Sequence, residues 1–231
     1  MSVAASPKLP RQKGMNFPYW ISRTVCGLFF NLFFKTRIVG VNNIPKRGAY
    51  LLVSNHVSYF DPPLISGTTP TPLYFFGRKS LLKNAWFWVL HRALNVIPVD
   101  LEGNNVGAIK AAIRTLKEDK PLVVFPEGTR SEDGKLKQGQ SGAGFIACTA
   151  GVPVVPVRVF GTYEALDRAT TKPKWGMPLT VVVGKPISHV EYDPGTKTKD
   201  RYRIAVDRIM AAIGKIEKPR AHTDSEVEWN Y

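Results

Sequence analysis

Cysteine is scarce in this sequence: Cys26 and Cys148 are the only two among 231 residues. They lie far apart and show neither the spacing of zinc ligands nor that of a redox pair. A chain of this length buries roughly 70% of its unfolded surface and needs no disulfide or metal to fold. We therefore expect two small buried thiols in a reducing compartment and no metal site.

Long hydrophobic runs are also missing, since no stretch offers the roughly 20 uninterrupted apolar residues that cross a bilayer. Residues 17–34 are rich in aromatics but are interrupted by Arg23 and Asn31 and flanked by basic residues. As a helix this segment would be about 27 Å long, and a charge at mid-span costs roughly 2.5–3.5 kcal/mol on insertion. We expect a helix that lies in the membrane interface, where Trp and Tyr suit the headgroup boundary. A helix packed into the core is the alternative.

Acidic residues are the third shortage: 18 Asp and Glu stand against 32 Lys and Arg, for a formal net charge of +14. Such a protein is attracted to polyanions, namely nucleic acid, anionic lipid headgroups or phosphorylated substrates. The basic residues are scattered along the chain and form no recognised nucleic-acid module. Charge alone does not choose among these polyanions. With the aromatic segment 17–34, we expect a membrane surface of anionic lipid as a partner and no nucleic acid, and nucleic-acid binding is the alternative.

Short β-branched runs alternate with helical periods from residue 37 onward. The patterns predict strands over residues 37–41, 50–54, 73–77, 95–99, 122–125, 154–159 and 179–183. Helices are expected from Asn104 or Asn105 to before Pro121, over residues 142–150, and over residues 202–216. This alternation predicts an α/β fold, with a mixed, largely parallel sheet flanked by helices.

The same patterns divide the chain into three parts. Residues 1–36 are expected to form a basic tail and an aromatic, membrane-docking helical segment, and residues 37–218 an α/β domain. Residues 219–231 form a polar C-terminal tail without periodicity, which we expect to be frayed.

The first candidate site is NHVSYFD, residues 55–61, which directly follows the predicted strand 50–54. Loops after strand ends are where α/β sheets place their sites. The spacing allows Asp61 to hydrogen-bond to His56, which would fix the tautomer of the ring and free its other nitrogen to act as a base. A surface turn before two prolines is the alternative for this motif.

The second candidate site is FPEGTRS, residues 125–131, directly after the apolar run 121–125. Arg130 offers a planar fork that suits a phosphate. Glu127 can accept from a substrate hydroxyl or brace the arginine, and Gly128 allows close approach to the backbone. A solvated turn with an ion pair of little energetic value is the alternative.

Together and in this order, the two motifs resemble the glycerolipid acyltransferase family, and within it the bacterial 1-acyl-sn-glycerol-3-phosphate acyltransferases. Residues 151–159, GVPVVPVRV, look like a further motif of that family, and residues 136–147 resemble its linker helix. The similarity extends from about residue 40 to 187, and residues 17–34 resemble the membrane-docking element of the bacterial members. The resemblance implies catalysis by His56 and Asp61, and substrate binding by Asn55, Glu127, Gly128, Thr129 and Arg130.

One motif departs from the family pattern. Residues 96–100 read VIPVD, and Leu101 follows where the family has an arginine that is associated with the phosphate of the acceptor. Arg78 and Lys79 resemble a basic segment of the family. Because they follow the predicted strand 73–77, we expect them to reach the same end of the sheet as His56 and to supply the missing charge.

The resemblance implies transfer of an acyl group from a thioester, acyl-CoA or acyl carrier protein, to the hydroxyl of a lysophospholipid, without a bound cofactor. In a bacterium such an enzyme would be a monotopic protein of the cytoplasmic face of the inner membrane. Three alternatives stay open. They are another lysolipid acceptor, a thioesterase that uses the same His and Asp on water, and an inactive lipid-binding module.

Overall fold

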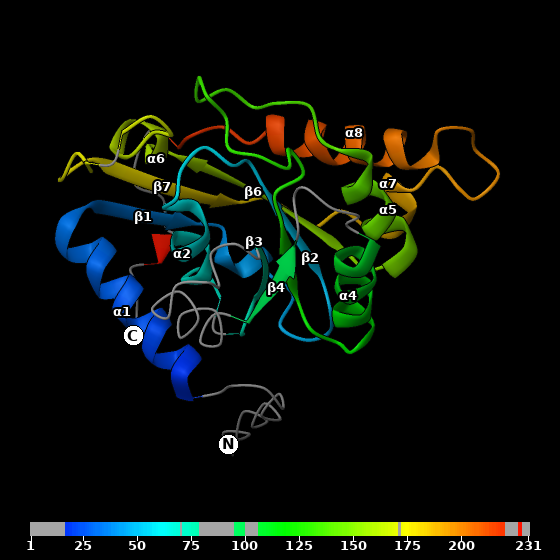
Figure 1. Ribbon diagram of the computed structural model, residues 1–231, viewed down its shortest axis with the longest axis horizontal. Coiled ribbons are helices and arrows are strands. Elements are labelled where there is room, and N and C mark those ends of the chain that lie inside the picture. The colour runs from blue at the N-terminus through cyan, green and yellow to red at the C-terminus, as the bar shows by residue number, and fades with distance from the viewer. Residues whose placement is uncertain are drawn as a thin grey trace, which may run out of the picture.

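The computed structural model describes residues 17–69, 71–78, 95–99, 106–170, 172–219 and 226–227 (Figure 1). Its strands are β1 (Lys35–Val39), β2 (Leu51–Ser54), β3 (Tyr74–Arg78), β4 (Val96–Val99), β5 (Leu122–Val124), β6 (Val154–Phe160), β7 (Pro178–Val183) and β8 (Glu226–Val227). Its helices are α1 (Phe17–Phe33), α2 (Asp61–Ser66), α4 (Val106–Lys117), α5 (Ser141–Ala150), α6 (Thr162–Ala165), α7 (His189–Tyr192) and α8 (Arg201–Gly214), and η1 (Val41–Asn43) is a 3-10 turn.

The strands form one eight-stranded sheet in the order β4-β3-β5-β2-β6-β7-β1-β8. The first five of these are parallel to one another. Strand β7 runs antiparallel to β6, β1 runs parallel to β7, and β8 closes the edge antiparallel to β1. The expected mixed, largely parallel sheet flanked by helices is therefore confirmed.

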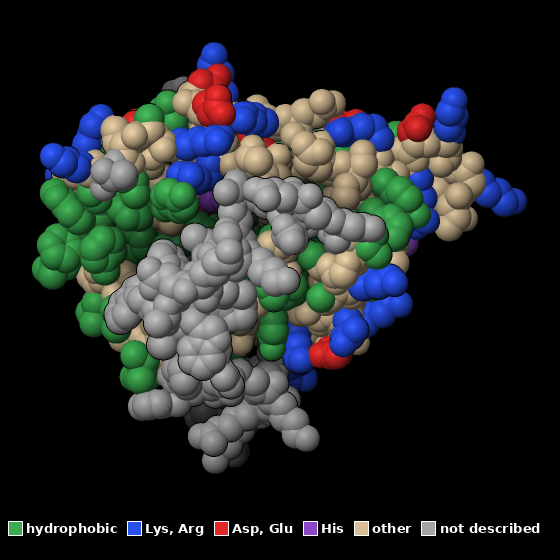
Figure 2. Space-filling model, in the orientation of Figure 1, with side chains coloured by type: hydrophobic (Ala, Val, Ile, Leu, Met, Phe, Trp, Pro, Cys, Tyr) green, Lys and Arg blue, Asp and Glu red, His purple; other side chains and the backbone are tan. Residues whose placement is uncertain are grey.

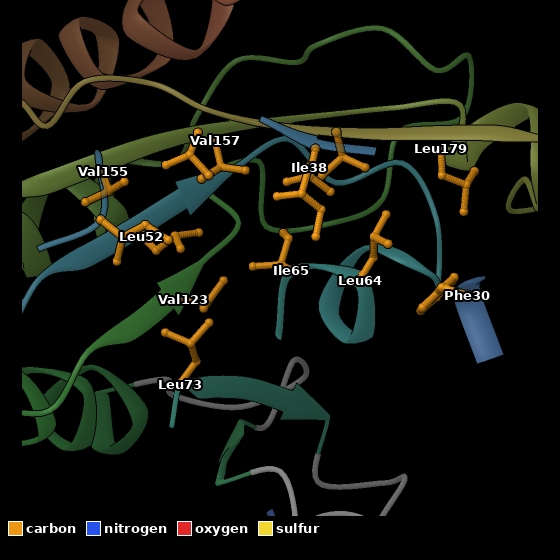
Figure 3. Close-up of a cluster of buried hydrophobic side chains, with 14 of the residues drawn as sticks. Phe30, Ile38, Leu52, Leu64, Ile65, Leu73, Val123, Val155, Val157 and Leu179 are labelled. Carbon is orange, nitrogen blue, oxygen red and sulfur yellow. The ribbon is translucent and has the colours of Figure 1, made fainter. Parts of the chain in front are cut away.

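The central strand β2 is buried on both faces, because helices cover the sheet on either side. Leu52 faces a core made with α1 and α2, while Leu51 and Val53 face a second core made with α4, α5 and α8. Figure 3 shows the first of these cores, where Leu64 and Ile65 of α2 lie against strand side chains such as Val157. Such near-continuous apolar strands are typical of parallel sheets that are covered on both faces.

Helices α5 and α8 approach each other unusually closely at Gly144. A Cβ atom at this position would lie 2.0 Å from the carbonyl oxygen of Tyr202, a distance that no side chain tolerates. The glycine therefore lets the two helix backbones come into contact on the face of the sheet that α4, α5 and α8 cover.

Two boundaries differ from the expected ones. Strand β1 begins at Lys35, so the division after residue 36 falls inside the first strand. The C-terminal tail is also not frayed throughout, since Val227 pairs with Ile38 in the antiparallel ladder of β1 and β8. A two-residue strand is too short to show periodicity, and its pairing depends on an open sheet edge rather than on its own composition.

Candidate active site

The carboxyl ends of the neighbouring strands β5, β2 and β6 lie side by side, and a loop leaves the sheet from each of them. Residues 55–60 follow β2, residues 125–131 follow β5, and Gly161 follows β6. Because the carboxyl ends of neighbouring parallel strands lie at the same end of the sheet, side chains that are distant in sequence meet there. The two motifs found in the sequence are brought together here.

His56 and Asp61 form the expected pair. Nδ1 of His56 lies 2.9 Å from Oδ2 of Asp61. A carboxylate only accepts hydrogen bonds, so this contact holds the ring proton on Nδ1 and leaves Nε2 with its lone pair free. The His56 side chain keeps 18% of its surface exposed, whereas that of Asp61 is fully buried.

Asp61 is held by four hydrogen bonds. Its Oδ2 atom also accepts from the backbone N–H groups of Val57 and Ser58, at 2.7 and 2.8 Å, and its Oδ1 atom accepts from the hydroxyl of Thr162 at 2.7 Å. Thr162 begins α6, directly after β6, so the carboxylate links two of the three loops. These contacts satisfy a buried acidic group and fix the position from which it orients His56.

The His56 ring is fixed from a second side by Phe125, the residue directly after β5. The two rings stack with centroids 4.1 Å apart and an angle of 21° between their planes. The ring therefore has a hydrogen bond at one edge and an aromatic surface against one face, which restricts its rotation.

Glu127 braces the two loops against each other. Its carboxylate is 3% exposed and accepts from the backbone N–H of His56 at 2.8 Å and from that of Lys137 at 3.0 Å. Burial raises the pKa of this carboxyl group, and the two N–H donors oppose the increase. Each carboxylate oxygen thus holds one main-chain group, and the expected contact of Glu127 with the acceptor hydroxyl or with Arg130 stays a prediction.

Asn55 likewise holds main-chain groups, and its expected contact with the substrate stays a prediction. Its side chain is buried, with Oδ1 accepting from the Val159 N–H at 2.8 Å and Nδ2 donating to the Val159 carbonyl at 3.0 Å. The amide thus extends the pairing of β2 and β6 by one step beyond the last residue of β2. This anchors the chain immediately before His56.

Arg130 lies over an aromatic ring that the sequence analysis did not single out. Its guanidinium carbon is 3.5 Å from the centroid of Tyr59, whose side chain is 62% exposed. Its Nη1 atom is buried without a hydrogen-bond partner among the described residues. The position of Tyr59 inside the motif NHVSYFD is a signal that could have identified it, since an aromatic ring can bind a cation.

Gly128, Thr129 and Arg78, three further predicted site residues, lie at or directly after the carboxyl ends of β5 and β3. Gly128 and Thr129 are exposed, and Gly128 has a φ of 75°, a left-handed conformation that favours glycine. Arg78 is the last residue of β3, and its backbone pairs with Val99. It therefore lies at the carboxyl end of the parallel strands, two strands away from β2. Lys79, Asp100 and Leu101 lie outside the described residues.

No group of three or more His, Cys, Asp or Glu side chains that could hold a metal ion occurs in the described part of the chain. Cys26 lies on α1 and Cys148 on α5, and both are unpaired. Burial raises the pKa of Cys26 and raises that of Cys148 to about 11, so neither thiol is an activated nucleophile.

Sequence comparison places this site in a known class. The model of the family described as Acyltransferase matches residues 35–160, which is more than half of the 231 residues. The match begins with the first residue of β1 and ends with the last residue of β6, so it contains both motifs. The chain belongs to this acyltransferase family and is an O-acyltransferase.

Several similar proteins are named 1-acyl-sn-glycerol-3-phosphate acyltransferase. The chain is 25% identical over 183 residues to that of Bacillus subtilis (strain 168), covering 78% of this chain and 87% of the relative. It is 27% identical over 228 residues to that of Pseudomonas aeruginosa, covering 94% and 82%.

A solved structure shares the fold. The crystal structure of the 1-acyl-sn-glycerophosphate acyltransferase from Thermotoga maritima superimposes with a TM-score of 0.71 at 26% identity, covering 87% of this chain and 81% of that chain. The resemblance drawn from the two motifs is therefore confirmed at the level of the family and of the fold.

Proposed function

We propose that this O-acyltransferase transfers a fatty acyl group from an acyl thioester to the free hydroxyl of 1-acyl-sn-glycerol-3-phosphate, giving phosphatidate. The observation that carries this proposal is the His56–Asp61 pair at 2.9 Å, beside an arginine whose buried Nη1 has no partner among the described residues. The similar proteins from Bacillus subtilis and Pseudomonas aeruginosa, which are named for this acceptor, support it.

In this mechanism His56 is the general base. Its free Nε2 removes the proton from the acceptor hydroxyl as the oxygen attacks the thioester carbonyl. The tetrahedral intermediate collapses with cleavage of the carbon–sulfur bond, and the imidazolium returns the proton to the departing thiolate. Asp61 holds the ring in the productive tautomer and stabilises the imidazolium between the two steps, which its position on Nδ1 allows.

Direct transfer needs no acyl-enzyme. Neither Cys26 nor Cys148 lies in the loops that contain His56, and both thiols have raised pKa values. General-base catalysis contributes about 10²–10⁴-fold, so positioning of the two substrates must supply much of the remaining rate enhancement. The donor is a thioester of coenzyme A or of an acyl carrier protein, acting as co-substrate and not as a resident cofactor.

Arg130 is proposed to bind the phosphate of the acceptor. A guanidinium group presents a planar fork that matches phosphate oxygens, and here one nitrogen is already desolvated and unpaired among the described residues. The stack on Tyr59 restrains the plane of the fork before the substrate arrives. Arg78 remains a proposed second cation for this phosphate, since the carboxyl end of β3 lies at the same end of the sheet.

The enzyme is further proposed to work at a membrane surface, with α1 as the contact. Along this helix Ile21, Val25, Leu28 and Leu32 occupy one stripe at helical spacing, and each is exposed. Arg23 points away from the stripe, toward the Gly67 carbonyl at the end of α2, which lies 3.5 Å from its Nη2. The described helices include none that is long and apolar enough to cross a bilayer.

A panel of acceptors tests the proposal. The full-length protein is supplied with acyl-CoA or acyl carrier protein thioester and with lysophosphatidate, lysophosphatidylethanolamine or lysophosphatidylcholine, and products are identified by mass. We expect phosphatidate as the main product and none from the His56→Ala variant. A higher kcat/KM for a zwitterionic lysolipid would move the function to another acceptor, and thioester cleavage that does not depend on lysolipid would indicate a hydrolase.

A further inference from the structure

An exposed tryptophan lies at the tip of the turn that precedes β7. We define the Trp175 turn as residues 172–176, which read KPKWG. Trp175 is 56% exposed, and Lys172 and Lys174 beside it are exposed as well. A single exposed apolar residue is ordinary on a protein surface, so the significance of this one depends on its neighbours.

The Trp175 turn is fastened to the end of α1. The Gly176 N–H donates to the Phe33 carbonyl at 2.8 Å, and the Lys35 N–H donates to the Met177 carbonyl at 3.1 Å. The Trp175 ring packs against Phe33 and Phe34 with centroids 5.2 and 5.6 Å apart. The ring is therefore held in one orientation beside the helix.

The Trp175 turn and the exposed side of α1 form one surface. Phe33 joins them, because it is 43% exposed, contacts Trp175 and follows Leu32 at the end of the apolar stripe. In Figure 2 hydrophobic side chains gather over the α1 region at the left, with Lys and Arg side chains just above them. Lys35, which is also exposed, adds a third cation beside the tryptophan.

This surface borders the active-site loop. The half-buried ring of Phe29 on α1 lies 6.1 Å from that of Trp175 and 6.2 Å from that of Phe60, the residue directly before Asp61. A lipid acceptor that leaves a bilayer in contact with this surface would therefore reach the carboxyl end of the strands, where His56 lies. Neither the apolar stripe alone nor the net charge explains why the tryptophan and the lysines gather at this end of α1.

We propose that the Trp175 turn is a second lipid-contacting element. Together with α1 it binds an anionic bilayer, so that the end of the sheet that holds His56 faces the membrane. Trp175 would lie at the headgroup boundary, where amphipathic rings are favoured. Lys172, Lys174 and Lys35 would meet lipid phosphates, each contributing about fivefold to binding on an anionic surface. This inference rests on the proposed function, in which the acceptor is a membrane lipid.

Charge and shape favour a bilayer over a protein partner. The apolar stripe from Ile21 to Leu32 extends over about 16 Å of helix and carries no exposed charge. Among the described residues, Lys35, Lys172 and Lys174 lie at its C-terminal end beside an aromatic ring, and basic residues next to an apolar helix face are typical of a helix that lies in an interface. An acidic carrier protein is the competing occupant, and the experiment distinguishes the two.

Charge reversal provides the test. Lys172→Glu/Lys174→Glu is compared with Lys197→Glu/Lys199→Glu, a matched pair of exposed lysines in the loop between α7 and α8 that changes net charge equally. Binding is measured by co-sedimentation with vesicles of phosphatidylcholine, with or without phosphatidylglycerol. We expect the first variant to lose about 25-fold or more in binding to anionic vesicles, and the control to lose far less. Trp175→Ser should weaken binding to both kinds of vesicle.

Two readouts make the result decisive. Circular dichroism establishes that the variants are folded, and activity on a short-chain lysophosphatidate below its critical micelle concentration should stay at the wild-type level. Equal losses in the two charge-reversal variants would overturn the proposal, as would loss of binding to acyl carrier protein with vesicle binding unchanged. A wild type that binds anionic vesicles but does not acylate lysophosphatidate would refute the proposed acceptor and leave the docking surface standing.

Discussion

At the residue scale, the site depends on how few positions the His56 ring can take. Asp61 holds Nδ1, Phe125 covers one face, and Glu127 holds the backbone N–H of the same residue. The base is thus prepared before the substrate binds, which is the arrangement that lowers the cost of reorganisation during the reaction.

The His56–Asp61 pair allows a test that separates chemistry from folding. We expect His56→Ala to lose about 10²-fold or more in kcat. Asp61→Asn can still accept from Val57 and Ser58 through its oxygen and donate to Thr162 through its nitrogen, so its melting temperature should stay near that of wild type. Because the amide carries no charge to stabilise the imidazolium, its kcat should also fall steeply. Either variant with more than about a tenth of the wild-type kcat would exclude the proposed base.

Arg130 and Tyr59 should act as one unit on acceptor binding. Arg130→Ala should raise the KM for lysophosphatidate about tenfold or more, since hydrogen bonds to charged groups contribute about 1.5–3 kcal/mol. Tyr59→Leu should raise it about two- to fivefold, whereas Tyr59→Phe keeps the ring and should have little effect. The double variant Arg130→Ala/Tyr59→Leu should be no worse than Arg130→Ala.

A matched control for this pair is Tyr74→Leu, which removes a ring 5.6 Å from the Lys120 ammonium nitrogen at the opposite end of the sheet. Acceptor KM should not change in that variant. A fall in kcat with an unchanged KM in Tyr59→Leu would show that the ring acts on the transition state and not on phosphate binding.

At the element scale, two buried side chains tie the loops to the sheet and to each other. Asn55 continues the ladder between β2 and β6, and Glu127 joins the loop after β5 to the residue after Asn55. Through these main-chain contacts both side chains determine where the proposed base stands. Loss of either should change the geometry of the site more than its chemistry.

Glu127→Gln tests this role. A glutamine has one accepting oxygen, so its NH₂ group would face a backbone N–H donor of His56 or Lys137. We expect a loss of about 1–3 kcal/mol in the free energy of unfolding and a fall in kcat with little change in acceptor KM. The control is Glu132→Gln in the same loop, whose exposed ion pair with Arg168 should contribute little. Equal stability of the two variants in urea would contradict the bracing role.

At the scale of the whole molecule, α1 belongs to the fold as well as to the proposed membrane surface. Tyr19, Phe30 and Phe34 are buried, and the Tyr19 hydroxyl accepts from the backbone N–H of Leu73 at 3.0 Å. One side of this helix thus belongs to the core, and the opposite, exposed side is the one that we propose as the membrane contact. Deleting the segment would remove core residues, so membrane binding has to be tested by substitution on the exposed side.

Replacing Ile21, Val25 and Leu28 by serine removes most of the exposed stripe without touching the buried side. We expect vesicle binding to fall at least about tenfold, because burying each aliphatic side chain is favourable by about 1.5–3 kcal/mol. Circular dichroism should show a folded protein. Val190→Ser, at an exposed apolar position on α7, is the control. Unchanged co-sedimentation of the triple variant would exclude α1 as the membrane contact.

The sequence by itself determined the family, the strands β1 to β7 with the longer helices α4, α5 and α8 among them, and the His56–Asp61 pair. These depend on local information, namely β-branched runs that end at turns, and two side chains five positions apart in one loop. Arg130 was also identified, because its motif follows β5 directly.

Only the tertiary structure decided what Asn55 and Glu127 do, since their partners are main-chain groups 104 and 71 residues away that no side-chain pattern encodes. The same holds for Tyr59 beneath Arg130, for β8 on the edge of β1, and for Trp175 beside Phe33. Each is a contact between segments that lie far apart in the sequence and that the order of strands in the sheet brings together. The order of strands in the sheet, and not the spacing of residues along the chain, therefore determines which residues meet at the carboxyl ends of the strands.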